Sequence, residues 1–193
     1  MKHFELKAEL RTNIGKKACK AVRKENGIPC VIYGGTETIH ISTNQSDVRK
    51  LIYTPEVLFA DITVNGKTYI SIVKDVQYHP TTDKILHIDF YEVSTDKPMK
   101  IAIPLKLIGS SVGVKAGGKL QQKIRKITVK SLMENIPENF TVDISELNIG
   151  QSMRIRDLVS DTLEFVDAKP TIIALIASSR GAVAADTDTE PAK

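Results

Sequence analysis

Apolar and polar residues alternate with a period of two along several short segments of the chain, which is the pattern of half-buried β-strands. The clearest segment is KILHIDFYE, Lys84–Glu92. Leu86, Ile88 and Phe90 are predicted to enter a core, so the opposite face of the strand carries an imidazole next to a carboxylate. Hydrophobic patterning predicts five further strands in the first half, at Phe4–Leu10, Ile28–Gly35, Thr38–Ser42, Val57–Val64 and Lys67–Gln77.

A segment with helical spacing follows the first predicted strand. In KKACKAVRKENG, residues 16–27, Ala18, Ala21 and Val22 fall on one stripe, and basic residues cover the remaining faces. Gly27 is predicted to end this helix, because glycine favours the C-terminal stop of a helix. The sequence therefore predicts a short helix with a small-residue inner face and a basic outer face.

Two further local signals organise the first half of the chain. Asn44 and Asp47 have the spacing of an N-cap residue and its N3 partner, which predicts a second helix that continues to about Tyr53. Asn65 and Gly66 indicate a two-residue hairpin between two strands, because both central residues of a type I′ turn need positive φ. HPTTDK, residues 79–84, is predicted to be a loop.

The composition turns polar at STDKP, Ser94–Pro98, which predicts a boundary between domains 1–94 and 95–177. Strands are predicted in the second domain at Met99–Leu107, Leu120–Ser131, Phe140–Ile144 and Thr171–Ala177. The glycine-rich GSSVGVKAGG is predicted to be a loop, and SELNIGQSMRIRDL to be a turn that leads into a short strand. Residues 178–193 are small, acidic and poor in hydrophobics, which predicts a disordered tail.

The predicted fold class is β-rich α+β, with two short helices in the first domain and a mostly β second domain. Neither half shows the regular βαβ alternation of a doubly wound fold. Hydrophobic residues make up 41% of the chain and charged residues 26%, which is a globular composition. Aromatic residues make up only 5% and Trp is absent, so the core is expected to consist mainly of Ile, Val and Leu.

The distribution of charge is more informative than the net charge of +4. Six basic residues and no acidic residue lie between Arg11 and Lys24, and nine basic residues and no acidic residue lie between Lys97 and Met133. A solvated lysine-rich face is one explanation for each stretch. Contact with the phosphates of a nucleic acid is the other.

Several classes of site and location find no support in the sequence. Cys19 and Cys30 stand alone, without the further ligands of a zinc site, so we expect two structural thiols in a reduced intracellular protein. GSSVGVKAGGKL lacks the G-K-[ST] of a phosphate-binding loop. Since MKHFELKAEL has no apolar core and no apolar run approaches ~18 residues, neither export through a signal peptide nor a membrane span is expected.

His79, His87 and Asp89 are the remaining candidates for chemistry. They could perform acid–base catalysis, but His87 and Asp89 are ~7 Å apart along the strand backbone, and no nucleophile is indicated beside them. They could also be ordinary solvated side chains. A third hypothesis is RNA recognition, in which the polar strand face meets base edges or 2′-hydroxyls while the basic helix neutralises phosphates. That hypothesis requires the helix and the strand to be adjacent.

Several segments of the chain together resemble a known family. LRTNIGKKACKAVRKENGIPCVIYGG, DVQYHP and ILHIDFYEV together resemble the N-terminal domain of the bacterial 50S large-subunit ribosomal protein L25 family, which binds 5S rRNA. IPLKLIGSSVGVKAGGKL, IPENFTVDISELNIGQSMRIRDL and the acidic tail resemble the second domain of the long form, called the general stress or Ctc form. The resemblance covers about Phe4–Ala177.

The resemblance implies a six-stranded β-barrel-like N-terminal domain, similar to the anticodon-binding domains of glutaminyl-tRNA synthetases. It implies a structural, non-enzymatic component of the cytoplasmic 50S subunit that binds the loop E region of 5S rRNA and needs no cofactor, metal, small-molecule substrate or membrane. The second domain is expected to contact 23S rRNA or neighbouring ribosomal proteins. The positions that match the family's RNA contacts are Arg11, Gly15, Lys16, Lys20, Arg23, Tyr33, Gln77, His79, His87 and Asp89.

Three positions depart from the family pattern. Cys19 stands where a small hydroxyl residue is common and Ala21 where a second arginine is frequent, which weakens the expected phosphate contact of the helix. Cys30 replaces the usual alanine of a buried strand and is expected to change packing only. Two alternatives to a ribosomal role stay open from the residues themselves: a stress-related interaction protein that acts off the ribosome, and an RNA-processing enzyme that uses His79, His87 and Asp89.

Overall fold

The computed structural model describes residues 2–94, 97–160 and 162–178, and the predicted tail lies outside these ranges apart from Ser178. The chain forms two compact units. The first contains the residues up to Ile101 together with Leu132–Glu138, and the second contains Ala102–Ser131 and the residues from Asn139 onward. Each unit is described by itself below.

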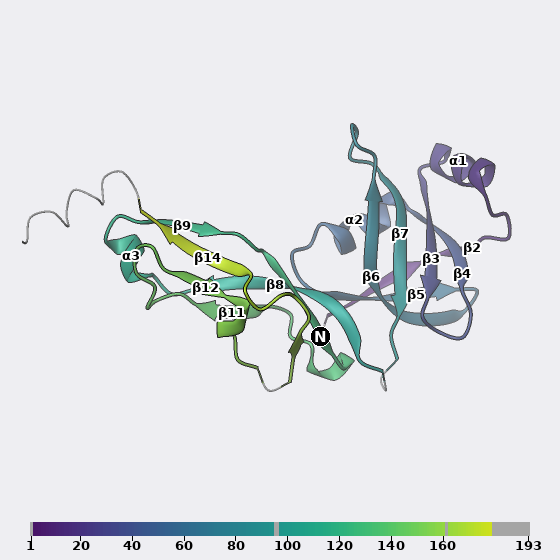
Figure 1. The fold of residues 1–193 in the computed structure, drawn as a ribbon. Coiled ribbons are helices and arrows are strands. Elements are labelled where there is room, and N and C mark those ends of the chain that lie inside the picture. Colours follow the sequence, from purple (N-terminus) through teal and green to yellow (C-terminus); the bar gives the residue numbers. More distant parts are fainter. Residues whose placement is uncertain (1, 95–96, 161, 179–193) are drawn as a thin grey trace, which may run out of the picture. The chain divides into compact units, whose positions relative to one another are not determined.

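The first unit is built on a sheet of seven strands in the order β1-β5-β6-β7-β3-β4-β2 (Figure 1). The strands are β1 (Lys2–Lys7), β2 (Glu9–Leu10), β3 (Gly27–Tyr33), β4 (Ile39–Asn44), β5 (Leu58–Val64), β6 (Lys67–Tyr78) and β7 (Ile85–Glu92). Helix α1 (Lys16–Lys24) connects β2 to β3, and helix α2 (Gln45–Ile52) connects β4 to β5. Apart from the first, every strand predicted in this half is present, with ends that differ by two residues or fewer.

The strand predicted at Phe4–Leu10 closes the sheet on itself. β1 and β2 occupy the two ends of the sheet, yet only Ala8 separates them in the chain. Lys7 pairs with Thr63 of β5, Glu9 pairs with Ser42 of β4, and the amide of Ala8 donates to the carbonyl of Thr63 at 3.1 Å. The segment is therefore one strand interrupted where its partner changes, and the sheet curls into the expected six-stranded β-barrel-like fold.

The interior of the first unit is almost entirely aliphatic, as the composition predicts. Ile88 and Phe90 of β7 are fully buried and pack in one cluster with residues of β1 and β3 to β5. Leu86 is only half-buried, and Ile85 takes its place in the core. The predicted inward position of Leu86 is wrong because the pairing of β6 and β7 shifts between Gln77 and Tyr78, which changes the face that each residue presents.

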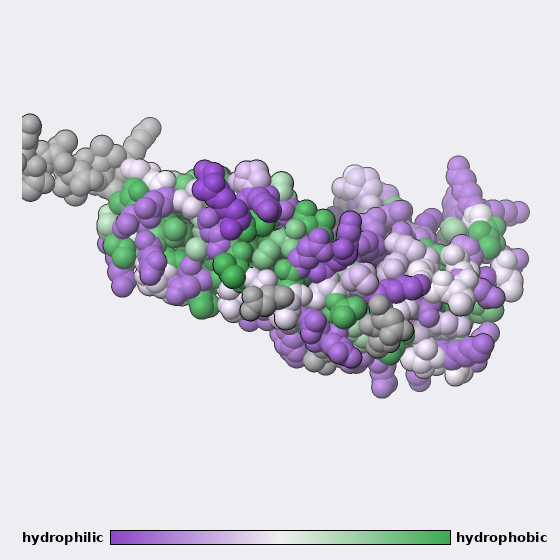
Figure 2. Space-filling model, turned by 60° about the horizontal axis from the view of Figure 1, so that its bottom comes forward, coloured by the Kyte–Doolittle hydropathy of each residue, from purple (hydrophilic) through white to green (hydrophobic). Residues whose placement is uncertain are grey.

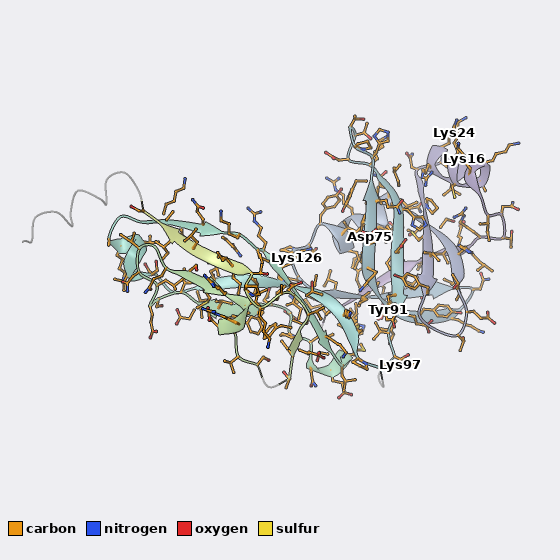
Figure 3. All side chains as sticks on the ribbon, in the orientation of Figure 1. Lys16, Lys24, Asp75, Tyr91, Lys97 and Lys126 are labelled. Atoms are coloured by element: carbon orange, nitrogen blue, oxygen red, sulfur yellow. The ribbon has the colours of Figure 1, made fainter. Side chains whose placement is uncertain are left out.

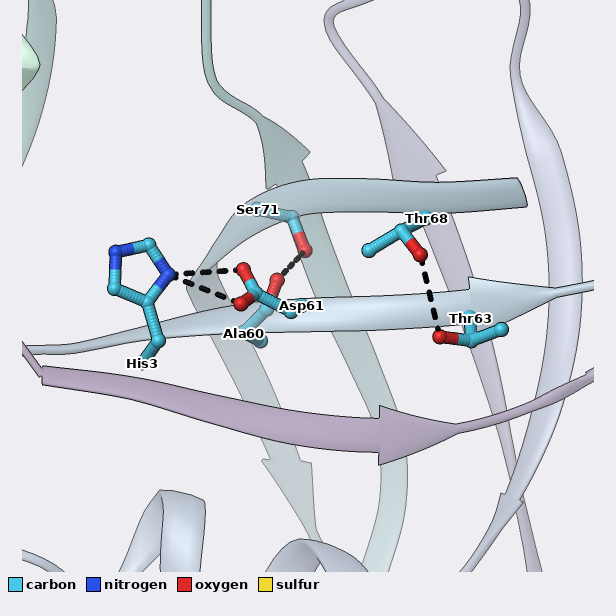
Figure 4. Close-up of polar contacts among 6 residues, drawn as sticks. All are labelled: His3, Ala60, Asp61, Thr63, Thr68 and Ser71. Carbon is cyan, nitrogen blue, oxygen red and sulfur yellow. Dashed lines mark hydrogen bonds and ion pairs between the residues drawn. The ribbon is translucent and has the colours of Figure 1, made fainter. Parts of the chain in front are cut away.

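Polar side chains fix β5 between its two neighbours (Figure 4). The buried hydroxyl of Ser71 on β6 donates to the carbonyl of Ala60 at 3.2 Å. On the exposed side, Nδ1 of His3 on β1 lies 3.0 Å from a carboxylate oxygen of Asp61. A one-residue slip would bury the pair His3 and Asp61, so these contacts and the apolar face select the same register.

The predicted hairpin turn and the predicted start of α2 are confirmed in position, but the predicted capping contacts are not all present. Asn65 and Gly66 both have positive φ, 49° and 81°, as the hairpin requires. Asn44 is the N-cap of α2, although its side chain makes no capping hydrogen bond. The prediction that Gly27 ends α1 is wrong: α1 ends at Lys24, Asn26 adopts the left-handed conformation (φ 59°), and Gly27 begins β3.

The second unit consists of two smaller sheets, ordered β11-β8-β10-β13 and β12-β14-β9. Their strands are β8 (Met99–Ile108), β9 (Lys119–Gln122), β10 (Lys126–Ser131), β11 (Phe140–Asp143), β12 (Ser152–Arg154), β13 (Glu164–Phe165) and β14 (Ile172–Ala177). The remaining elements of this unit are helix α3 (Val112–Lys115) and a 3₁₀ turn, Ile155–Asp157, while a second 3₁₀ turn, Met133–Asn135, lies in the segment that belongs to the first unit. The prediction of a mostly β second half is confirmed.

Two predictions in the second half are wrong in detail. Leu120–Ser131 is two strands in different sheets, because the chain crosses between them at residues 123–125 while its apolar pattern continues. The glycine-rich segment contains α3, whose N-cap Ser111 accepts a hydrogen bond from the amide of Val114 at 3.1 Å. Gly113 is buried in α3. The backbone of Asn148 packs so closely against it that a Cβ would lie 2.7 Å away.

The two cysteines are expected to differ in reactivity. Burial raises the pKa of the Cys30 thiol to about 12, whereas Cys19 is partly exposed. Since the thiolate is the reactive form, a disulfide reagent at neutral pH should label one thiol of the native protein and two after denaturation. A Cys19→Ser variant should show no labelling until it unfolds, and rapid labelling of that native variant would contradict the buried placement of Cys30.

Candidate nucleic-acid interface

Helix α1 packs against β3, the strand paired with β7, so the basic helix and the polar strand are neighbours, as the RNA-binding hypothesis requires. Nε of Arg23 donates to the carbonyl of Leu86 at 3.0 Å, one residue before His87. The packing of α1 on β3 depends on Gly27 at the start of that strand, because a Cβ at this position would lie 2.8 Å from Cγ1 of Val22. The basic segment and the polar strand, which are separated by about sixty residues in the sequence, thus form one continuous surface.

The two lysines in the first turn of α1 do not stabilise the helix. Its first turn contains Lys16 and Lys17 and no acidic residue, so two cations face the positive end of the helix dipole. Each unfavourable charge of this kind costs on the order of 0.3–1 kcal/mol. Arg23 and Lys24 at the opposite end have the favourable placement. Figure 3 shows Lys16 and Lys24 extending from α1.

No ion pair among the described residues neutralises the basic side chains of α1. Gly15 precedes the helix with φ 111°, a conformation that side chains rarely adopt, and places the free amides of the first turn beside Lys16. Helix-terminal amides and unpaired lysines attract the same kind of ligand, an anion. This end of α1 is therefore suited to a phosphate group.

Arg11 anchors the loop that leads into α1. Its backbone amide donates to the carbonyl of His40 at 2.9 Å, and its guanidinium reaches the carbonyl of Asn13 at 3.2 Å and the Cys19 thiol at 3.4 Å. Arg11 thus connects β4 through its backbone, and the loop and the helix through its side chain. Cys19, whose contact with RNA the family pattern leaves in doubt, is here a partner of Arg11.

His87 and Asp89 are closer to each other than their backbone spacing indicates. Nδ1 of His87 lies 2.7 Å from Oδ1 of Asp89, an ion-pair distance, and both side chains are roughly a quarter exposed. The contact lacks the angles of a hydrogen bond, so the buried Nδ1 has no hydrogen-bond partner in the described part of the chain. Gln77 is paired opposite His87, and Asp75 opposite Asp89, in the β6–β7 ladder.

Tyr33 continues this face onto β3. Its ring meets the ring of Tyr91 edge-on, with centroids 5.7 Å apart. Burial raises the pKa of Tyr33, and the carboxylates of Asp89 and Asp75 raise it further, which places the phenol close to both acids. Sequence reasoning missed Asp75 and Tyr91, although Asp75 shares the period of two with Gln77 and Tyr91 shares it with Asp89.

His79 lies apart from these residues in the loop between β6 and β7. Its Nδ1 contacts the hydroxyl of Thr81 at 3.1 Å, and no contact of the described residues joins it to His87 or Asp89. In the described ranges, no group of three or more His, Cys, Asp or Glu side chains is arranged to hold a metal ion. No helix in these ranges is both long and apolar enough to cross a membrane.

The surface defined by α1 and the outward residues of β6, β7 and β3, here called the α1–β7 surface, combines two kinds of chemistry. The helix supplies exposed cations, and the strands supply an imidazole, an amide, two carboxylates and two phenols. Carboxylates in a basic surface repel phosphates, but they accept hydrogen bonds from base amino groups. The arrangement therefore favours a ligand with both a polyanionic backbone and exposed base edges.

Both halves of the chain are similar to known protein families. A family described as the Ribosomal L25p family matches residues 6–90, and one described as Ribosomal protein TL5, C-terminal domain, matches residues 98–180. Relatives named Large ribosomal subunit protein bL25 include one from Phocaeicola vulgatus, 39% identical over 94% of this chain and 96% of the relative. Another, from Bacteroides thetaiotaomicron, is 40% identical over 96% of this chain and 98% of the relative.

The packing of α1 against β3 gives a testable prediction about this surface. Gly27→Ala should destabilise the protein by ~1–3 kcal/mol, because the added methyl overlaps Val22. Val22→Ala in the same chain should restore part of the loss, since it removes the nearest atom. Denaturant unfolding of the single and double variants measures both effects, and equal stability of Gly27→Ala and the parent chain would contradict the close contact.

Proposed function

The chain belongs to the ribosomal L25p family, a family of ribosomal proteins and not of enzymes, and on this basis we propose that it is a structural component of the large ribosomal subunit that binds 5S rRNA. The observation that carries the proposal is the hydrogen bond from Arg23 to Leu86, which joins the basic helix to the polar strand. The protein then works on the ribosome in the cytoplasm.

The two parts of the α1–β7 surface have different roles in this proposal. Lys16, Lys20 and Arg23 neutralise phosphates, and Arg11 holds the helix in place. Gln77, His87, Asp89 and Tyr33 face the minor groove, whose wide and shallow form in RNA lets a flat strand surface approach. Gly15 lets a phosphate approach the helix start, and His79 extends the contact from the β6–β7 loop.

Loop E of 5S rRNA is the proposed target region. A sheet face with donors and acceptors, but few aromatic side chains, suits a structured minor groove better than a single strand, which would be bound by stacking. Asp89 is the residue that distinguishes recognition from simple charge attraction, because a carboxylate beside an RNA backbone is unfavourable unless it meets a hydrogen-bond donor.

The second unit offers a separate surface for the ribosome. Seven of the nine basic residues between Lys97 and Met133 belong to this unit, and among the described residues only Lys130 of these seven forms an ion pair, with Glu164 at 3.0 Å. Lys119 and Lys123 lie on or next to the edge strand β9, and both are exposed. Figure 2 shows hydrophilic side chains on this unit interspersed with apolar ones. We assign these free cations to the phosphates of 23S rRNA.

Binding to 5S rRNA should separate the two roles of the α1–β7 surface. His87→Ala or Asp89→Ala should weaken binding to a loop E fragment by ~1–3 kcal/mol, the range of a good polar base contact. Lys16→Ala and Lys20→Ala should each lower the salt dependence by about one unit of slope. A gel-shift titration of the full chain, with a fully paired duplex as the competing RNA, measures both.

Lys67→Ala is the matched control, because Lys67 is an exposed lysine at the other end of β6, beside the hairpin turn. It should change neither the affinity nor the salt slope. Unchanged affinity in both the strand and the helix series would contradict the assignment of this surface. Most of the protein in the ribosome-free fraction of a lysate would favour the off-ribosome role instead.

The second unit should strengthen retention on the large subunit. A Lys119→Ala, Lys123→Ala double variant should leave 50S particles at lower salt than the parent chain, because two phosphate contacts are lost. The control double variant Lys67→Ala, Lys130→Ala removes the same charge from other positions and should behave like the parent. Sedimentation of the subunit at increasing salt measures the difference, and identical release of both variants would contradict the second surface.

A further inference from the structure

A groove of about 900 Å³ opens in the first unit where three segments meet. Its wall is formed by Asn26 after α1, by the start and end of α2 with the cap residues Asn44 and Tyr53, and by the β6–β7 loop at Asp83. None of these residues belongs to the surface to which RNA contact was assigned above. The groove is large enough for a nucleotide, and polar and apolar atoms line it in about equal measure.

One side of the groove is aromatic. Tyr53 follows the last turn of α2 with 59% of its surface exposed, although a tyrosine of this size would normally cover apolar atoms. Tyr78 is also exposed, at 43%, and its phenol is close enough for Tyr53 to add to the rise in its pKa that burial causes. Exposed tyrosine rings are platforms on which unpaired bases stack.

The remaining lining groups are those that recognise a nucleotide. Arg49 is exposed and forms no ion pair among the described residues. The side-chain amide of Asn44 is at the N-cap but makes no capping hydrogen bond. Asp83 brings a carboxylate to the edge of the groove from a backbone with φ 52°. The guanidinium of Arg49 can bind a phosphate, and the amide of Asn44 and the carboxylate of Asp83 can bind the edge of a base. The exposed ring of Tyr53 can stack on the face of that base.

The local backbone supports a built site. Asn26 and Asp83 are two of the three described residues other than glycine with positive φ, and both line this groove. The third, Asn65, has its conformation explained by the hairpin turn. Asparagine and aspartate tolerate this conformation, but it is uncommon and is concentrated at functional sites. At Asn26 this conformation turns the chain from α1 into β3, and at Asp83 it turns the β6–β7 loop, so both residues bring their segments to the wall of the groove.

The groove adjoins the α1–β7 surface on two sides. Asn26 comes two residues after Lys24, the last residue of α1, and Asp83 shares the β6–β7 loop with His79. The amide of Asp83 donates to the carbonyl of His79 at 3.0 Å, which ties the two halves of that loop together. An RNA that lies along α1 and β7 therefore passes the mouth of the groove.

We propose that this groove holds one unpaired guanine nucleotide of the bound RNA, with its base on Tyr53, its Watson–Crick edge on Asp83 and Asn44, and its phosphate on Arg49. Guanine is favoured because a carboxylate accepts hydrogen bonds from its N1–H and its amino group together, a pair that no other common base presents. The inference rests on the proposed binding of 5S rRNA, and it adds a second, base-specific contact to the shape-dependent one.

Chemical probing of 5S rRNA bound to the full chain tests the groove. Kethoxal, which modifies the N1 and N2 edge of unpaired guanine, should find one guanine protected by the parent protein and reactive again in the complex with Tyr53→Ala. The affinity should fall by about 5- to 150-fold, the loss expected for one stacked base. Tyr53→Phe keeps the ring and should retain both the protection and the affinity.

Asp83→Asn is a second variant that leaves the size of the groove unchanged. It should restore the reactivity of the same guanine while the rest of the footprint on the minor groove persists. Unchanged protection and affinity in both Tyr53→Ala and Asp83→Asn would overturn the groove and leave the proposed function intact. Failure of the parent chain to bind 5S rRNA would instead overturn the proposed function, and the groove's role with it.

Discussion

The pairing of one strand with both ends of the same sheet is the constraint on which the first unit depends. Because β1 pairs with β5 and β2 with β4, the chain on the two sides of Ala8 links the two ends of the sheet. The curvature that this closure imposes buries the aliphatic cluster on one side and presents β6, β7 and β3 as a continuous convex face on the other. Every residue of the α1–β7 surface takes its position from this curvature.

The position of α1 is fixed by very few atoms. No residue of the helix is buried, so its attachment rests on the absence of a side chain at Gly27 and on the hydrogen bonds from Arg23 to Leu86 and from Arg11 to Cys19. The first turn even carries cations that oppose the helix dipole. A short helix with this little intrinsic stability is well suited to a surface whose ligand supplies the missing negative charge.

Much of this architecture could be predicted from the sequence, because period-two alternation and the Asn65-Gly66 turn are local signals. The closure at Ala8 could not, since alternation continues through the point where the partner changes. The contact between His87 and Asp89 was likewise hidden by a backbone estimate that ignores how side chains lean toward each other. The adjacency of α1 and β7 depends on tertiary packing. The family resemblance implied it, because the family's RNA contacts come from both elements. The groove beside Tyr53 combines three distant segments, none of which carries a motif.

The barrel-like sheet also determines when, during synthesis, the protein becomes able to bind RNA specifically. When the first strand leaves the ribosome, its pairing partners have not yet been synthesised. Its backbone hydrogen bonds can form only with β4 and β5, which begin more than thirty residues after β1. The hydrogen bond from Arg23 of α1 to Leu86 can form only after β7, which ends at residue 92, has been synthesised. A nascent chain that carries the whole basic segment therefore has no ordered surface for RNA. Completion of the barrel, rather than the appearance of the lysines, marks the moment at which specific binding begins.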